Sequence, residues 1–253
     1  MVLLGRWRAT GEELYREVAD LAEARAGMEL LVSGCGEGIT AEWLAARTGA
    51  AVTGVDPDPA RIARGERRRR ESTSEAGVTF EVAPLDDLPH ETAVFDAAVG
   101  ETAIAAARDP QRALAELVRV TRPLGRVVLL VPTWTSEIPA GDREALVERL
   151  GLRPYLLVEW KQMSREAGLV DLTVQDWSER GVASRGTSPA EPVPVLTWRQ
   201  KAHIAGRAWR RRGWRAARGA VRREMQLIEE LSGKRALGFQ VIAGVKWPHA
   251  RPV

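Results

Sequence analysis

The chain has 253 residues, of which 45% are hydrophobic and 28% charged, a composition that suits a folded core rather than a disordered chain. Its longest apolar runs, such as residues 127–131, fall far short of the roughly 20 residues of a membrane-spanning helix. Residues 1–5 lack the apolar stretch of a signal peptide, so we expect a cytoplasmic protein. A single cysteine excludes a disulfide framework, and His90, His203 and His249 show no ligand spacing, so no metal is expected.

The formal net charge of +3 conceals a strong asymmetry. Residues 199–223 carry ten basic side chains and no acidic one. Removing these ten from the 37 basic residues leaves 27 against 34 acidic ones, a net charge of −7 for the rest of the chain. An acidic body with one basic segment suggests an anionic partner, and the alternative is a solvated helix face.

Short apolar runs alternate with helix-like stretches in the first half of the chain, a pattern typical of a parallel sheet with crossover helices. The predicted strands are residues 30–32, 52–55, 78–82, 95–99, 126–131, 169–174 and 239–246. The predicted helices are a segment that ends at Gly27, residues 39–47, segments that begin at Asp58-Pro59 and Asp109-Pro110, and residues 142–150 and 157–167. The helix after Asp58 carries Arg61, Arg64 and residues 67–70, a charge run typical of a solvent-facing side.

A glycine-rich turn follows the first predicted strand, with glycines at 34, 36 and 38. Glycines let the backbone approach a ligand, and the helix behind the turn offers unpaired N–H groups. Asp56 closes the second strand 22 residues after Gly34, where a carboxylate can accept hydrogen bonds from both ribose hydroxyls. The arrangement is typical of nucleotide binding. Dinucleotide enzymes place the third glycine one residue later, at Ile39 here, so an NAD-dependent oxidoreductase is an alternative that lacks its glycine spacing.

Four segments in order carry a more specific signal: residues 30–38, Val55-Asp56, Leu88-Pro89 with Phe95-Asp96, and residues 119–125. Together they resemble the class I S-adenosylmethionine-dependent methyltransferases, in particular the small-molecule group. The resemblance covers about residues 10–135 and extends more loosely through residues 163–177 and the last strand. It implies an α/β, Rossmann-like fold in one domain, residues 1–253. The sheet would have seven mostly parallel strands, with strand seven antiparallel.

The resemblance also implies a site for S-adenosylmethionine and a small-molecule substrate. The implied cofactor-binding residues are Ser33, Gly34, Cys35, Gly36 and Gly38 in the turn, Asp56 at the ribose, Pro57, Leu85 and Asp86 at the adenine, and Gly100 beside the sulfonium. Glu101, just after the fourth strand, is the candidate catalytic base, and Tyr15 on the N-terminal helix is the candidate wall of the methionine end. Trp134 either stacks on the substrate or belongs to the rim of the core.

Three positions depart from the family pattern. Val32 and Pro84 stand where the family has acids, and Leu124 stands where it has a glycine. Asp86 could replace Pro84, and Glu37 or Glu101 could bind the methionine ammonium group. These departures motivate an alternative function, a methyltransferase-like protein that binds the cofactor without transferring its methyl group.

Residues 177–232 form an insertion between strands six and seven. In the family fold this connection emerges at the carboxyl ends of the parallel strands, where ligands bind. Apolar and small side chains recur at a 4-3 spacing, namely Trp198, Ala202, Ala205, Trp209, Gly213, Ala216 and Ala220. We therefore expect a helical lid. The basic face of residues 198–223 could meet water or an anionic membrane surface. No nucleic-acid-binding module is recognisable, so no nucleic acid is expected as a partner, and the oligomeric state stays open.

Deletion of residues 184–219 should abolish most turnover of an acceptor that the full chain methylates, because the lid would complete the acceptor pocket. Affinity for S-adenosylmethionine should persist, because the cofactor residues lie elsewhere in the chain. Calorimetry and a discontinuous assay for S-adenosylhomocysteine measure the two quantities, and unchanged turnover would contradict the lid.

Overall fold

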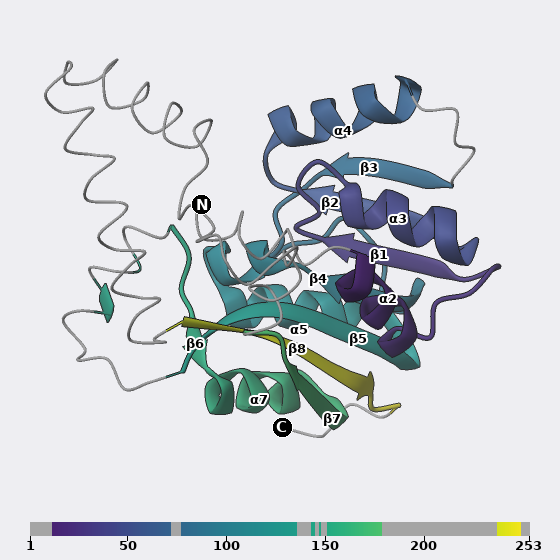
Figure 1. Ribbon diagram of the computed structural model, residues 1–253. Helices are drawn as coiled ribbons and strands as arrows, with labels where there is room; N and C mark the ends of the chain where they lie inside the picture. Colours follow the sequence, from purple (N-terminus) through teal and green to yellow (C-terminus); the bar gives the residue numbers. More distant parts are fainter. Residues whose placement is uncertain are drawn as a thin grey trace, which may run out of the picture.

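The computed structural model describes residues 12–71, 77–135, 143, 144, 147, 151–178 and 237–248. In this part of the chain one mixed sheet lies between two layers of helices (Figure 1). The strands are β1 (Glu29–Ser33), β2 (Ala51–Asp56), β3 (Val78–Val82), β4 (Phe95–Gly100), β5 (Thr121–Trp134), β6 (Tyr155–Leu156), β7 (Leu169–Asp176) and β8 (Leu237–Lys246). The helices are α2 (Glu12–Leu21), α3 (Ile39–Thr48), α4 (Pro59–Glu71), α5 (Pro110–Val120) and α7 (Leu157–Glu166), with a 3-10 turn η2 (Thr102–Ala106).

The sheet has the strand order β3-β2-β1-β4-β5-β8-β7. β8 runs antiparallel to both β5 and β7, while the pairings among β1 to β5 are parallel. The predicted Rossmann-like, mostly parallel sheet with an antiparallel last strand is confirmed, and β6 adds an eighth strand to the predicted seven. The chain leaves β1 toward β2 and β3 and then returns to β4 on the opposite side of β1. The carboxyl ends of β1 and β4 therefore form a topological switch point, the place where open α/β sheets bind ligands.

Alternation of side chains along β1 divides the core into two layers. Leu30 and Val32 pack on the face covered by α2 and α3, while Leu31 packs on the face covered by α5 and α7. All three side chains are fully buried. Because both faces are covered, the strand is a continuous apolar run rather than an alternating one.

β5 is longer than the sequence pattern predicted. The expected turn at residues 123–125 lies within the strand, where the register with β4 shifts between Phe95 and Ala97. Leu124 takes a left-handed φ of 66° there, and that conformation costs an L-residue about 1–2 kcal/mol. This geometry explains why the family has glycine at this position. The two-residue strand β6, which pairs with β5, was not predicted, since two residues carry no periodicity.

Some predictions fall on residues outside the described part of the chain. The predicted helix at residues 142–150 is described only at residues 143, 144 and 147, which are helical. The insertion is described only at residues 177 and 178, so the lid and its basic face stay predictions. Within the described residues, no helix is both long and apolar enough to cross a bilayer.

A charged pair on α5 holds the loop that follows β3. The Glu116 carboxylate accepts hydrogen bonds from Arg119 Nε (2.7 Å) and from the Leu88 backbone N–H (2.9 Å). Arg119 in turn donates to the carbonyl oxygens of His90 (2.8 Å) and Leu88 (3.1 Å). The hydrogen bond from Arg119 is the main cause that lowers the pKa of Glu116. The pair fixes the loop that carries Leu85 and Asp86.

Replacement of Glu116 by Gln should lower the free energy of unfolding at pH 7 by about 1–2 kcal/mol. A carboxyl group with a lowered pKa in the folded chain stabilises fully above its unfolded pKa of about 4.3, and this contribution is lost as the pH falls through the folded value. The gap between wild type and variant should therefore close below about pH 4. Urea unfolding at pH 7 and at acid pH measures the free energy of unfolding of wild type and variant, and Glu91→Gln, at an exposed position, is the control. A difference in free energy of unfolding that does not change with pH would contradict the stabilising role of the Glu116 carboxylate.

Candidate cofactor site

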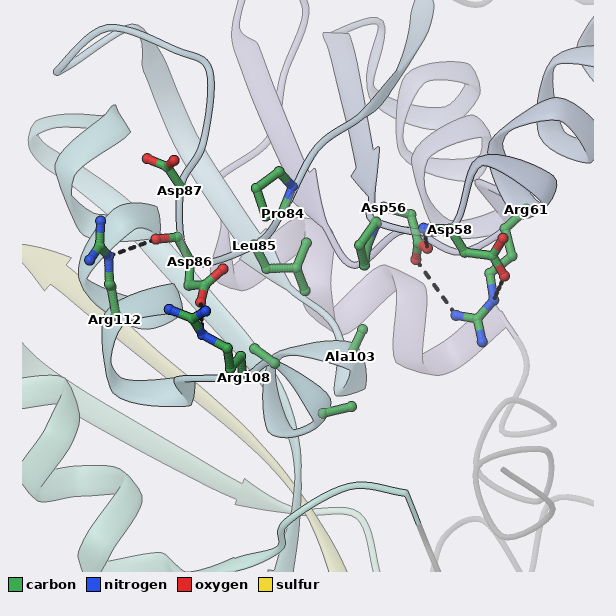
Figure 2. Close-up of a pocket in the computed structure, with 13 residues that line it drawn as sticks. Asp56, Asp58, Arg61, Pro84, Leu85, Asp86, Asp87, Ala103, Arg108 and Arg112 are labelled. Carbon is green, nitrogen blue, oxygen red and sulfur yellow. Dashed lines mark hydrogen bonds and ion pairs between the residues drawn. The ribbon is translucent and has the colours of Figure 1, made fainter.

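A pocket of about 660 Å³ opens at the carboxyl ends of β2 and β3 and beside η2 (Figure 2). Cavities of 300–1,000 Å³ are typical of small-molecule sites. Its lining residues are Asp56, Pro57, Asp58, Arg61, Pro84, Leu85, Asp86, Asp87, Ala103, Ala106, Ala107, Arg108 and Arg112. The structure thus brings together four of the predicted cofactor residues, Asp56, Pro57, Leu85 and Asp86, from two separate loops.

The Asp56 carboxylate joins the glycine turn to the start of α4. Its side chain is fully buried. Oδ2 accepts a hydrogen bond from the Gly36 N–H (2.9 Å), and Oδ1 accepts one from the Asp58 N–H (3.0 Å). Each carboxylate oxygen has two lone pairs, so both retain capacity for a hydroxyl donor from a ligand. A ribose diol has that donor pair.

The glycines of the turn are required by packing as well as by backbone conformation. Gly34 and Gly38 have φ angles of 76° and 83°, in the left-handed region that favours glycine. A Cβ on Gly34 would lie 2.6 Å from the Cβ of Ala103, and one on Gly38 would lie 2.2 Å from the ring of Phe80. Position 38 therefore requires glycine, because the Phe80 ring of β3 packs directly against it.

Cys35 and Glu101 flank the same turn from inside the fold. The Cys35 thiol is buried, and burial raises its pKa far above its ordinary value, with the negative charges of Glu101 and Asp56 raising it further. The raised pKa favours the protonated thiol over the reactive thiolate. The Glu101 N–H donates to the Ser33 carbonyl (2.9 Å), which anchors Glu101 at the end of β1.

The sequence family described as a methyltransferase domain matches residues 31–129, from β1 into β5. Methyltransferase GfsG of Streptomyces halstedii is 30% identical over 199 residues, which cover 68% of this chain and 72% of that protein. This chain belongs to the class I S-adenosylmethionine-dependent methyltransferases. A second methyltransferase relative, 27-O-demethylrifamycin SV methyltransferase of Amycolatopsis mediterranei, is 29% identical, over 66% of this chain and 62% of that protein.

Solved structures of low sequence identity share the fold. The [4+2]-cyclase SpnF has a TM-score of 0.71 at 23% identity, covering 94% of this chain and 81% of that chain. Phosphoethanolamine N-methyltransferase 2 of Haemonchus contortus, in complex with S-adenosyl-L-methionine, has a TM-score of 0.72 at 16% identity, covering 94% and 53%. These likenesses establish the architecture of a methyltransferase domain.

The described residues fit the methyltransferase cofactor. An adenosine needs a flat apolar pocket that ends in an acceptor for its hydroxyls, and Pro57, Leu85 and Asp56 supply these elements in the pocket. At the other side of the turn, the fully buried Ser33 hydroxyl has no hydrogen-bond partner among the described residues. A polar group in that state is costly unless a ligand or water satisfies it.

The acids that could replace the family acids missing at Val32 and Pro84 have different surroundings in the structure. Val32 is fully buried in the apolar core. An acid at this position would therefore need a polar partner below the turn. Glu37 forms an ion pair with Arg64 on α4, with 2.8 Å between Nε and Oε1. The Glu101 backbone is hydrogen-bonded to Ser33 beside the turn, and Asp86 lines the pocket.

The remaining sequence candidates are not among the lining residues of the pocket, namely Ser33, Gly34, Cys35, Gly36, Gly38, Gly100, Glu101, Tyr15 and Trp134. Tyr15 on α2 packs beside Trp43 on α3, with 5.7 Å between ring centroids. A Cβ on Gly100 would lie 2.6 Å from Ile104 Cδ1, so that glycine makes room for η2. Trp134 is only 4% exposed and belongs to the core, which favours its core interpretation over substrate stacking.

The α4 charge run is exposed at Arg64, Arg67, Arg69 and Arg70, as predicted, but one side of the helix also makes contacts that were not predicted. Arg61 lines the pocket, Arg64 pairs with Glu37, and Arg68 donates to Glu42 Oε2 (3.0 Å) and to the Glu37 carbonyl. Their spacing of i, i+3 and i+7 places them on one side of the helix, a signal that the sequence contained. Arg108 and Arg112 of the opposite pocket wall were also missed.

Replacement of Asp56 by Ala should weaken binding of S-adenosylhomocysteine by about 10- to 100-fold, since hydrogen bonds to charged groups contribute about 1.5–3 kcal/mol. Calorimetry measures the affinity, and thermal unfolding checks that the variant folds despite losing the acceptor of two backbone N–H groups. Glu91→Ala, an exposed acid outside the pocket, is the control. Unchanged affinity in the Asp56 variant would refute the assigned site.

Proposed function

We propose that this methyltransferase binds the adenosine of S-adenosylmethionine in the pocket of Figure 2 and transfers the methyl group to a small-molecule acceptor. The observation that carries the proposal is the buried Asp56 carboxylate, which closes the pocket and ties it to the glycine turn. The relatives support the class of acceptor, since one is named for the methylation of 27-O-demethylrifamycin SV.

The chemistry asks little of the protein beyond positioning. The bound cofactor supplies a methyl group on a sulfonium, which is already an activated leaving group. Alignment of the acceptor with the methyl can supply most of the acceleration, and a base is needed only where the acceptor must lose a proton. The protein's part is therefore to hold the two reactants in line and to exclude water.

We assign Glu101 to the methionine end of the site, as the acid that binds the ammonium group in place of the one missing at Val32. Three observations support this choice. Its backbone is anchored to Ser33, its charge acts on Cys35 within the turn, and the competing Glu37 is engaged by Arg64. The role of general base, the other possibility for Glu101, would leave the ammonium group without an acid from the described part of the turn.

The two roles of Glu101 separate in kinetics. If Glu101 binds the ammonium group, Glu101→Gln should raise the KM for S-adenosylmethionine by about tenfold and leave kcat nearly unchanged at saturation. A base would instead lower kcat and remove the acid limb of the pH profile. Glu91→Gln is the matched control. The measurement uses an acceptor that the wild-type chain turns over, and a fall in kcat alone would overturn the ammonium assignment.

A second candidate function has one observation in its favour. The buried Val32 removes a family acid, and the shared architecture extends to a [4+2]-cyclase, so the chain could bind the cofactor without transferring methyl. The wild-type chain is titrated with S-adenosylmethionine and S-adenosylhomocysteine and then incubated with hydroxyl- and amine-bearing acceptors. Methylated product in the mass spectrum supports transfer. Binding of both compounds without product from any acceptor favours the second function, and no binding of either removes both.

A further inference from the structure

Arg61 reaches from the first turn of α4 into the ribose side of the pocket. Its Nη1 lies 3.7 Å from Asp56 Oδ2, and its Nε lies 3.4 Å from Asp58 Oδ2. The side chain is 29% exposed, while that of Asp56 is fully buried. Figure 2 shows the guanidinium extended toward both carboxylates, on the wall opposite Arg108 and Arg112.

The Arg61 guanidinium and a ribose hydroxyl would compete for the same oxygen, Asp56 Oδ2. Oδ2 of Asp56 already accepts the Gly36 N–H, so one lone pair on that oxygen remains. Arg61 presents a positive charge toward this lone pair, and a ribose hydroxyl would need it as well. The Asp56 carboxylate is also closed off from solvent, so the ribose cannot reach it unless a neighbouring group moves.

The other arginines on this side of α4 do not share the conflict. Arg64 and Arg68 make their contacts with Glu37 and Glu42, in and beyond the glycine turn. They strengthen the turn without covering the Asp56 carboxylate. Arg61 alone among these three lines the pocket.

We propose that Arg61 is an affinity-limiting gate of the ribose subsite, which neutralises Asp56 and Asp58 in the empty pocket and must leave Asp56 when the adenosine binds. The inference rests on the proposed cofactor site. Part of the binding free energy is then used to separate the ion pair. The return of Arg61 to Asp56 also favours dissociation of the product, S-adenosylhomocysteine, so Arg61 sets product release as well as affinity.

The test compares three variants of the full chain by calorimetry with S-adenosylhomocysteine and with adenosine. Arg61→Met keeps the aliphatic stem and removes the charge, so it should bind both compounds about three- to tenfold more tightly, a range that fits a partly exposed ion pair. The gain should be equal for the two, because they share the ribose. Arg61→Lys keeps the charge and should stay within about twofold of wild type. Arg67→Met, at an exposed position of α4 outside the pocket, should do likewise.

A second measurement follows the rate at which S-adenosylhomocysteine dissociates. Arg61→Met should slow the dissociation of S-adenosylhomocysteine by a similar factor in stopped-flow displacement. Unchanged or weaker binding by Arg61→Met, or an equal gain in Arg61→Lys, would overturn the gate. Absence of binding by the wild-type chain would instead overturn the proposed function, so the two failures are distinct. Thermal unfolding of each variant confirms that the folded chain is compared.

Discussion

The buried carboxylate of Asp56 is the interaction on which the site depends. It accepts one hydrogen bond from the glycine turn after β1 and one from the residue that begins α4. These are charge-assisted hydrogen bonds from backbone N–H groups, which are stronger than neutral ones. A single side chain at the end of β2 therefore fixes the spacing of two segments from different crossover units, and it does so at the wall of the pocket.

The helix α4 reinforces the same turn from outside. Phe80 of β3 fills the space that three glycines leave between the turn, β2 and α4, since a Cβ on Gly38, Gly54 or Gly65 would lie within 3.5 Å of its ring. Arg64 and Arg68 then attach Glu37 to the helix. The position of the turn is thus determined by close packing below and ion pairs above. The backbone of the turn is therefore preformed, which reduces the cost of binding, and Arg61 is the side chain that we expect to move.

Local patterns predicted most of this fold because they are fixed by short-range chemistry. The short apolar run of β1 and the Asp-Pro starts of α4 and α5 depend on neighbours in sequence, and the structure has these elements where the pattern placed them. The extension of β5 could not be predicted, because the strand continues through a break in its pairing with β4, and Leu124 takes its left-handed φ within that break. The arginines of the pocket were missed for a related reason: a basic helix face has the same sequence pattern whether it meets water or carboxylates.

The absence of an acid at Val32 of β1 and the presence of Glu101 after β4 are related through the pairing of these two strands. Ser33 of β1 is in register with Gly100 of β4, so the carboxyl ends of the strands lie side by side. An acid two residues before the turn and an acid just after β4 approach the same region from adjacent strands. Val32 packs into the apolar core, where an ionised carboxylate would be costly without a partner. Glu101 stands instead in a half-buried position beside the turn, and it is the acid that we propose for the ammonium group of the cofactor.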